Sequence, residues 1–185
     1  MGDIRRWTTL RRERIADCRV FAVERALARA SDDGQEADFY RIVSADWVQI
    51  VPVTAADEIV MIRQYRHGAD AVTLEIPGGL VDGGESPVAA AARELLEETG
   101  YRAARLVPLG AVNPNPALFS NRLHAFAAED AVQVAEIRND EHEHTVVECV
   151  PRARLTKLLC DGSIDHALVV ATLWRYWHER GAGAE

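Results

Sequence analysis

The segment from residue 86 to residue 100 constrains the fold most, because it reads as a helix with a defined start and end. Ser86 is a typical N-cap residue, and Pro87 suits the first helical position, where its missing N–H costs nothing. Gly100 stands where a helix C-terminus favours a left-handed residue. The residues with the three-and-four spacing of one buried face are Val88, Ala91, Ala92, Leu95 and Thr99.

Three glutamates lie on another face of this predicted helix. Glu94, Glu97 and Glu98 stand at i, i+3 and i+4, positions whose Cβ atoms lie about 5–6 Å apart. We expect this face to point away from the apolar stripe and into a cleft. Taken alone, the triplet is equally typical of a solvated acidic face, so its interpretation depends on the residues before it.

The residues upstream extend the pattern over positions 79–101. Gly79 is followed after five residues by Glu85, and after seven more by the run 93–101, Arg-Glu-Leu-Leu-Glu-Glu-Thr-Gly-Tyr. This arrangement resembles the sequence motif of the Nudix hydrolase family, and only Tyr101 departs mildly from the usual aliphatic residue. Agreement at so many fixed positions and spacings is far more specific than a lone glycine-rich loop.

The resemblance implies a fold, a metal and a class of reaction. The fold is α/β, the Nudix fold, with a mixed β-sheet sandwiched between helices (α/β/α). The reaction is hydrolysis of a phosphorus-containing anhydride, a pyrophosphate bond, with Mg²⁺, or with Mn²⁺ in its place, cations that prefer carboxylate oxygens. The implied metal ligands are Glu94, Glu97, Glu98 and the carbonyl of Gly78, and Glu97 and Glu98 also count as catalytic. Gly79, Glu85 and Arg93 count as structural, with an ion pair of Glu85 and Arg93 that holds the loop on the helix.

Residues outside the motif indicate the substrate. Gln64-Tyr65-Arg66, the run 74–79 and Pro116 resemble the ADP-ribose and nucleoside diphosphate-sugar pyrophosphatase branch. That branch releases a nucleoside monophosphate and a sugar phosphate. Arg66 can clamp a phosphate bidentately, although a surface arginine at a strand end is an equal alternative. The implied substrate contacts are Arg66, Glu75, Pro116, Phe21 and Phe39.

An acidic run at 140–144, Asp-Glu-His-Glu-His, precedes a predicted strand. In the same branch a late acidic loop supplies the general base, which makes Glu143 the first candidate and Glu141 the second. A base there has to reach the attacking water directly or through one bridging water. A solvated charge run is the alternative, and the two histidines also permit metal ligation, without the spacing of a zinc site.

Alternating charged and apolar residues predict an N-terminal antiparallel β element over 1–44, with two or three strands, ahead of a Nudix domain over 45–185. The resemblance implies a homodimer whose N-terminal strands cross over and whose Phe21 and Phe39 sandwich the base. Packing in a core or an interface is the alternative for both rings. Further strands are predicted at 47–54 and 58–64, joined as a hairpin, and at 73–76, 105–112, 122–128 and 145–150, with helices at 152–160 and 165–180.

Composition narrows the possible partners. The net charge of −8 argues against nucleic acid as a partner, but a bound divalent cation lets an acidic site accept a small anion. Three cysteines without close spacing favour free, buried thiols in a reducing compartment. The longest late apolar run, 167–174, is too short to span a bilayer, so we expect no membrane partner and a cytoplasmic protein.

Other functions remain open at this point. A Nudix enzyme for GDP-mannose or ADP-glucose is one alternative, because residues 113–116, Asn-Pro-Asn-Pro, differ from the Ser-Pro-Gly common in ADP-ribose enzymes. A dinucleoside polyphosphate or a nucleoside triphosphate is another possible substrate, but Pro116 and the N-terminal element argue against it. A non-catalytic Nudix-fold sensor of ADP-ribose is a second, although such modules usually lose glutamates that this chain retains. RNA decapping would need a basic surface, which an acidic chain offers poorly.

Overall fold

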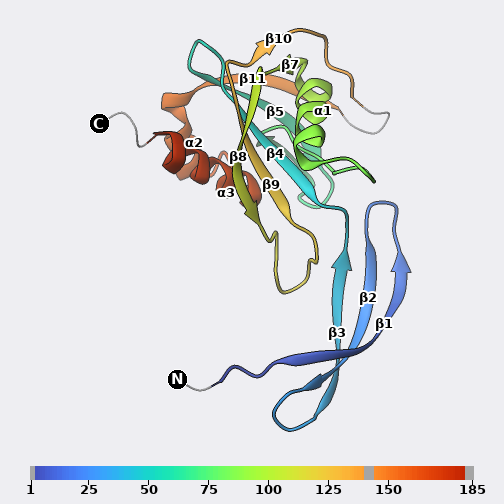
Figure 1. Ribbon diagram of the computed structural model, residues 1–185. Coiled ribbons are helices and arrows are strands. Elements are labelled where there is room, and N and C mark those ends of the chain that lie inside the picture. Colours follow the sequence, from blue (N-terminus) through green and yellow to red (C-terminus); the bar gives the residue numbers. More distant parts are fainter. Residues whose placement is uncertain (1–2, 140–143, 182–185) are drawn as a thin grey trace. The chain divides into compact units, whose positions relative to one another are not determined.

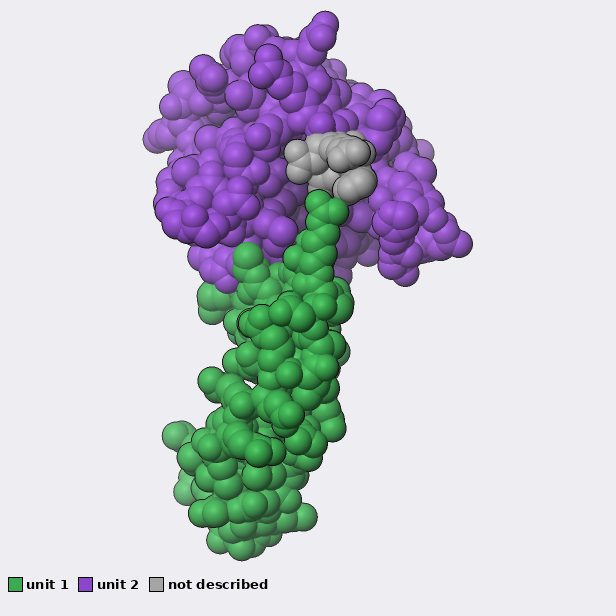
Figure 2. All heavy atoms as spheres, turned by 90° about the vertical axis from the view of Figure 1, so that its right-hand side faces the viewer, with its two compact units in different colours: residues 1–45, 113–122 green, residues 46–112, 123–185 purple. Residues whose placement is uncertain are grey.

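The computed structural model describes residues 3–139 and 144–181. The chain forms two compact units, coloured separately in Figure 2: unit 1 holds residues 1–45 and 113–122, and unit 2 holds 46–112 and 123–185. The division at residues 44 and 45 stays a prediction. What the sequence did not suggest is that residues 113–122 group with the N-terminal strands.

Unit 1 contains a three-stranded antiparallel sheet in the order β1 (Trp7–Asp17), β2 (Ala22–Ala30) and β3 (Glu36–Val43) (Figure 1). The predicted N-terminal antiparallel element is therefore confirmed, with three strands. Small side chains on β2 allow rings from its two neighbours to meet: Trp7 pairs with Ala30 and Phe39 with Ala26, and the two ring centroids lie 4.8 Å apart.

Unit 2 contains two larger sheets. The mixed sheet has β9 (Leu123–Glu129) between a parallel β4 (Trp47–Pro52) and an antiparallel β8 (Arg105–Val112). The antiparallel sheet has β5 (Glu58–Arg66) between β6 (Ala71–Glu75) and β11 (Thr145–Pro151). A short ladder joins β7 (Tyr101–Arg102) to β10 (Val132–Gln133).

Helices cover both sides of the strands of unit 2 (Figure 1). On one side α1 (Pro87–Thr99) packs Ala91 and Leu95 with Val48 and Phe126. On the other side lie α2 (Leu155–Cys160) and α3 (Ala167–Tyr176), which bury apolar side chains with those of β4, β5 and β8. The short helical turns η1 (Arg152–Arg154) and η2 (Trp177–Gly181) precede α2 and follow α3. This arrangement confirms the predicted α/β fold with a mixed sheet between helices.

The predicted hairpin of residues 47–64 is wrong. Its two strands share a single bridge, Val53 with Ile59, and then enter different sheets. Both β4 and β5 are buried along most of their length, as central strands are, and β5 is paired on both of its edges. A continuous apolar run shows that a strand is buried without showing which strand lies beside it.

The ends of α1 agree with the prediction, whereas its buried face is rotated about the helix axis relative to the predicted one. Ser86 Oγ accepts from the amide of Ala89 at 3.3 Å, and Gly100 has φ +72°. Val88 and Ala92 are exposed, while Ala90, Glu94 and Glu98 are buried beside the correctly predicted Ala91, Leu95 and Thr99. The four consecutive alanines at 89–92 fit either face, so the pattern could not fix the rotation of the helix, and two of the glutamates border the core instead of opposing it.

The cysteines and the surface of the chain complete this description. All three cysteines are free, but Cys18 and Cys160 are exposed, which corrects the expectation that they are buried; Cys149 is half-buried. Among the described residues, no helix combines the length and the apolar character needed to cross a membrane.

The corrected face of α1 generates a stability prediction. Replacing Leu95, which is 1% exposed, by Ala should lower the free energy of unfolding by about 2–5 kcal/mol, because it leaves a cavity between α1 and the mixed sheet. Val88→Ala on the same helix, at a side chain 46% exposed, should change it by less than about 0.5 kcal/mol. Urea denaturation of both variants measures the difference; equal losses would contradict this orientation of α1.

Candidate functional site

The segment Pro77–Gly79 runs beside β4 and is held there by backbone hydrogen bonds. The amide of Val48 donates to the carbonyl of Gly79 at 2.9 Å, and the amide of Gly79 donates to the carbonyl of Val48 at 3.1 Å. Successive amides of an extended segment point to opposite sides. The N–H of Gly78 accordingly points the other way and donates to Glu98 Oε2 at 2.8 Å, which fixes one of the predicted metal ligands against the backbone.

Close contacts require glycine at position 78, and at position 79 glycine leaves room for the Glu94 carboxylate. A Cβ on Gly78 would overlap the carbonyl oxygen of Val48. A Cβ on Gly79 would lie 2.5 Å from Cδ and 2.8 Å from Oε2 of Glu94. The two glycines therefore let the backbone approach the carboxylates of α1.

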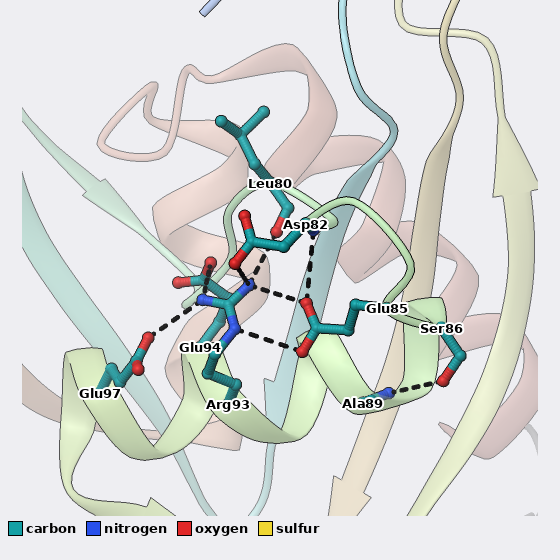
Figure 3. A network of polar contacts seen from close by, with 8 residues as sticks. All are labelled: Leu80, Asp82, Glu85, Ser86, Ala89, Arg93, Glu94 and Glu97. Atoms are coloured by element: carbon teal, nitrogen blue, oxygen red, sulfur yellow. Dashed lines mark hydrogen bonds and ion pairs between the residues drawn. The ribbon is translucent and has the colours of Figure 1, made fainter.

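Arg93 connects the loop to the helix through four carboxylates (Figure 3), and the weakest of these contacts joins Nη2 to Asp82 Oδ2 at 3.7 Å. Its Nε and Nη2 donate to Glu85 at 3.3 and 3.1 Å, and Nη2 also donates to the carbonyl of Leu80 at 2.9 Å. Its Nη1 donates to Glu94 Oε1 at 2.8 Å and to Glu97 Oε2 at 3.0 Å. The predicted contact of Glu85 with Arg93 is thus one part of a larger network.

Carboxylates make up most of this network. The hydrogen bond between Arg93 and Glu85 raises the pKa of Arg93 and lowers that of Glu85, so both side chains stay charged near neutral pH. Five carboxylates, those of Asp82, Glu85, Glu94, Glu97 and Glu98, belong to this network or adjoin it, and Arg93 contacts four of them. Glu94 and Glu98 are also buried.

This donor set fits a divalent cation by its chemistry and charge. Carboxylate and carbonyl oxygens are the ligands that hard divalent cations prefer, and Glu94, Glu97, Glu98 and the Gly78 carbonyl belong to one short stretch of structure. In the described parts of the chain, however, no three His, Cys, Asp or Glu side chains converge on a single point. Arg93 Nη1 lies between Glu94 and Glu97, so a cation that contacts both has to open the bond to Glu97, whose side chain is 45% exposed.

Arg66 and Glu75 form a second charged pair on the antiparallel sheet. Nε and Nη2 of Arg66 donate to Oε1 and Oε2 of Glu75, both at 2.8 Å, and Thr73 Oγ1 donates to Oε1 at 2.6 Å. Burial acts to raise the pKa of Glu75, but the hydrogen bonds and charge of Arg66 outweigh it, so that pKa is lowered. Arg66 at the end of β5 is therefore oriented by a buried carboxylate and is not a loose surface arginine.

The remaining predicted substrate contacts belong to unit 1. Phe21 lies in the turn between β1 and β2, Phe39 lies on β3 opposite Ala26, and Pro116 lies in the segment 113–122. Four residues of β2 separate Ala22, next to Phe21, from Ala26, a length of about 13 Å. Phe21 and Phe39 of one chain therefore start from well-separated backbone positions along β2, and the Phe39 ring contacts Trp7.

Both candidates for the general base, Glu141 and Glu143, lie outside the described residues. The segments on either side of them are described, and both contact the last turn of α1. The amide of Arg138 donates to the carbonyl of Glu97 at 2.8 Å. Thr145 Oγ1 lies 2.9 Å from the carbonyl oxygen of Glu98 and 2.8 Å from Asn139 Oδ1. No spacing in the sequence signals these anchoring contacts, because they join residues some forty positions apart.

Tyr101, the one unusual residue of the motif, packs its ring against the core beneath α1. Its hydroxyl lies 3.5 Å from Cys149 Sγ on β11, and this contact, with partial burial, raises the pKa of Tyr101 to about 12. The ring therefore serves the packing function of an aliphatic residue, with a polar contact added at its far end.

Comparison with known proteins agrees with the fold and the motif. The NUDIX domain family model matches residues 45–173. The ADP compounds hydrolase NudE of Escherichia coli K12 is 32% identical over 173 residues, 92% of each chain, and the ADP-ribose pyrophosphatase of Bacillus subtilis 168 is 37% identical over 101 residues, 54% of this chain and 55% of that protein. A crystal structure of an ADP compounds hydrolase superposes with a TM-score of 0.87 at 30% identity and covers all of both chains.

These matches establish the class of the protein. The chain belongs to the Nudix hydrolase family and is an enzyme of that family, which acts on phosphorus-containing anhydrides. Nudix hydrolases generally use divalent metals, in agreement with the negative charge of the cluster on α1.

The contact of Gly79 with Glu94 generates a prediction about metal binding. Gly79→Ala should weaken binding of a divalent cation at least about tenfold, because the new Cβ displaces the Glu94 carboxylate. Gly83→Ala in the same loop is the matched control, since a Cβ there meets nothing within 4 Å. Isothermal titration with Mn²⁺ measures both affinities; equal affinities would contradict a metal role for Glu94.

Proposed function

We propose that this enzyme hydrolyses the diphosphate of a nucleoside diphosphate sugar resembling ADP-ribose, giving a nucleoside monophosphate and a sugar phosphate. The observation that carries the proposal is the cluster of carboxylates on α1 and the glycine loop, which Arg93 and the Gly78 amide hold together. The substrate class rests on relatives named for ADP compounds, ADP-ribose and, in mouse, ADP-sugars, the last 34% identical over 143 residues.

We assign the cation as Mg²⁺, with Mn²⁺ as a substitute, held by Glu94, Glu97, Glu98 and the carbonyl of Gly78. When bound, it supplies charge neutralisation of the diphosphate and orientation of a water molecule. The residues of the chain have separate tasks in this scheme. Arg93 and Glu85 hold the loop on α1, and the N–H of Gly78 orients the carboxylate of Glu98.

Substrate binding is assigned to residues outside the motif. Arg66, oriented by Glu75, is proposed to bind the diphosphate, because a guanidinium pairs with phosphate oxygens through parallel hydrogen bonds. Phe21, Phe39 and Pro116 are proposed to contact the nucleoside. The separation of about 13 Å along β2 between the backbone positions of Phe21 and Phe39 favours an arrangement in which each ring comes from a different copy of the chain.

A homodimer is accordingly part of the proposal. The sheet of unit 1 exposes large apolar side chains that a second copy of the chain could cover. Trp7, Leu10, Ile15, Phe39 and Tyr40 on its strands are between 37% and 53% exposed. Exposed apolar side chains gathered on one small unit are typical of an interaction surface.

A panel of substrates tests the proposed function. With Mg²⁺, we expect kcat/KM for ADP-ribose to exceed that for GDP-mannose and for a dinucleoside polyphosphate by at least about tenfold, a difference that a few specific contacts can supply. Phosphorus NMR should identify AMP and ribose phosphate as products. Residues 113–116 are the reason to include GDP-mannose, and a preference for it or for the polyphosphate would overturn the substrate assignment.

The metal glutamates generate a kinetic prediction. Glu97→Gln and Glu98→Gln should each lower kcat at least about a hundredfold, because each removes a charged oxygen ligand from the reaction centre. Glu179→Gln, at an exposed glutamate of η2, is the control and should leave kcat unchanged. Circular dichroism checks that each variant is folded. Wild-type rates in both active-site variants would exclude α1 as the metal site.

The position of the general base generates a further prediction. Both segments that flank Glu141 and Glu143 are anchored on the last turn of α1, which favours a base from this loop. Glu143→Gln should lower kcat by about 10²–10⁴-fold, the usual contribution of a general base, and Glu141→Gln by much less. The reverse order of effects would move the role to Glu141, and small effects in both variants would place the base elsewhere.

A further inference from the structure

The carboxylate of Glu75 has one acceptor position that the Arg66 and Thr73 contacts do not fill. An ionised carboxylate offers about four lone-pair sites to donors. Oε1 accepts from Arg66 Nε and Thr73 Oγ1, and Oε2 accepts from Arg66 Nη2. The fourth site, on Oε2, faces Nδ1 of His166 at 3.8 Å. Glu75 is only 1% exposed, so its remaining lone pair gains little from solvent.

His166 reaches Glu75 from a distant part of the chain. It stands immediately before α3, its backbone extended (φ −67°, ψ 111°), and its carbonyl accepts from the amide of Val170 at 3.0 Å. A residue at this position commonly turns its side chain back to the helix amides. The imidazole of His166 makes no such capping bond, and its Nδ1 is buried beside Glu75 without a hydrogen bond in the described structure.

The chemistry of the two groups determines which of them carries the proton. If Nδ1 were unprotonated, its lone pair would face the lone pair of an ionised carboxylate in a buried site, which is repulsive. A protonated Nδ1 instead supplies the fourth donor to Glu75, and a shift of less than 1 Å turns the 3.8 Å approach into a hydrogen bond. His166 is also among the groups that lower the pKa of Glu75, although Arg66 contributes more.

We propose that His166 is a positioning residue that donates a hydrogen bond from Nδ1 to Glu75 and thereby fixes the guanidinium of Arg66. Thr73 and His166 each hold one oxygen of Glu75 independently of Arg66. The orientation of the carboxylate plane therefore stays fixed when Arg66 binds an anion. The side chain of Arg66 is 40% exposed, and the plane of the Glu75 carboxylate sets the orientation of its guanidinium. The effect of His166 on catalysis rests on the proposed function, whereas the hydrogen bond from His166 to Glu75 rests only on the positions of the two side chains.

Nitrogen-15 NMR tests the hydrogen bond without reference to activity. At pH 8, where an ordinary imidazole is neutral, the shifts of the two ring nitrogens show which one carries hydrogen. We expect a protonated Nδ1 in His166, contrary to the preference of free histidine for Nε2. An unprotonated Nδ1 would overturn the proposal.

Solvent exchange of the Arg66 Nε–H tests the effect on the arginine. We expect exchange about tenfold faster in His166→Phe, which keeps a ring without nitrogen, and in His166→Ala, because the carboxylate loses one of its two independent supports. His178→Phe is the matched control, since His178 packs on Trp174 in the last turns of the chain. Unchanged exchange in both His166 variants would overturn the positioning role.

Kinetics with ADP-ribose separate this proposal from the proposed function. His166→Phe should raise KM about five- to tenfold and leave kcat within about twofold, because a poorly held Arg66 weakens binding without touching the glutamates of α1. A fall in kcat at constant KM would contradict positioning through Arg66. If the wild-type enzyme does not hydrolyse ADP-ribose, the proposed function fails, and the two NMR measurements still decide whether His166 holds Arg66.

Discussion

The ion pairs of Arg93 are the interaction on which the candidate site depends. One guanidinium contacts the carboxylates of Glu85, Glu94 and Glu97 and the carbonyl of Leu80, and so joins the glycine loop to α1. A cluster of carboxylates this close would otherwise repel itself and attract water into the edge of the core. Arg93 removes part of that repulsion and holds the carboxylates close together, as binding of a divalent cation requires.

The rest of unit 2 places this cluster. Pairing of the segment 77–79 with β4 fixes the direction of the Gly78 amide, which holds Glu98. Packing of Leu95 on the mixed sheet fixes the rotation of α1, which sets Glu94 against Gly79. The antiparallel sheet contributes Arg66, and α3 contributes the histidine that faces its carboxylate partner. The orientation of the polar groups in the site therefore depends on packing and pairing outside the site.

The sequence predicted those features that local chemistry determines. The caps of α1, the spacing of its glutamates and the contact of Glu85 with Arg93 all lie within 23 residues, and the helix period brings them together. The rotation of α1 was not predictable, because the alanines at 89–92 are equally suited to a buried or an exposed face. The partners of β4 and β5 were not predictable either, because buried runs do not encode which strand lies beside them. His166 approaches Glu75 across 91 positions, and no local pattern marks that contact.

The central claim is that the carboxylates of α1 form a site for divalent cations in which Arg93 occupies part of the space between ligands. Anomalous diffraction from a crystal soaked in Mn²⁺ tests it most directly. We expect a manganese peak at direct-coordination distance, about 2.1–2.2 Å, from carboxylate oxygens of Glu97 and Glu98, with the Arg93 bond to Glu97 opened. A crystal with no peak at α1, or with manganese bound elsewhere while Arg93 still bridges Glu94 and Glu97, would contradict it.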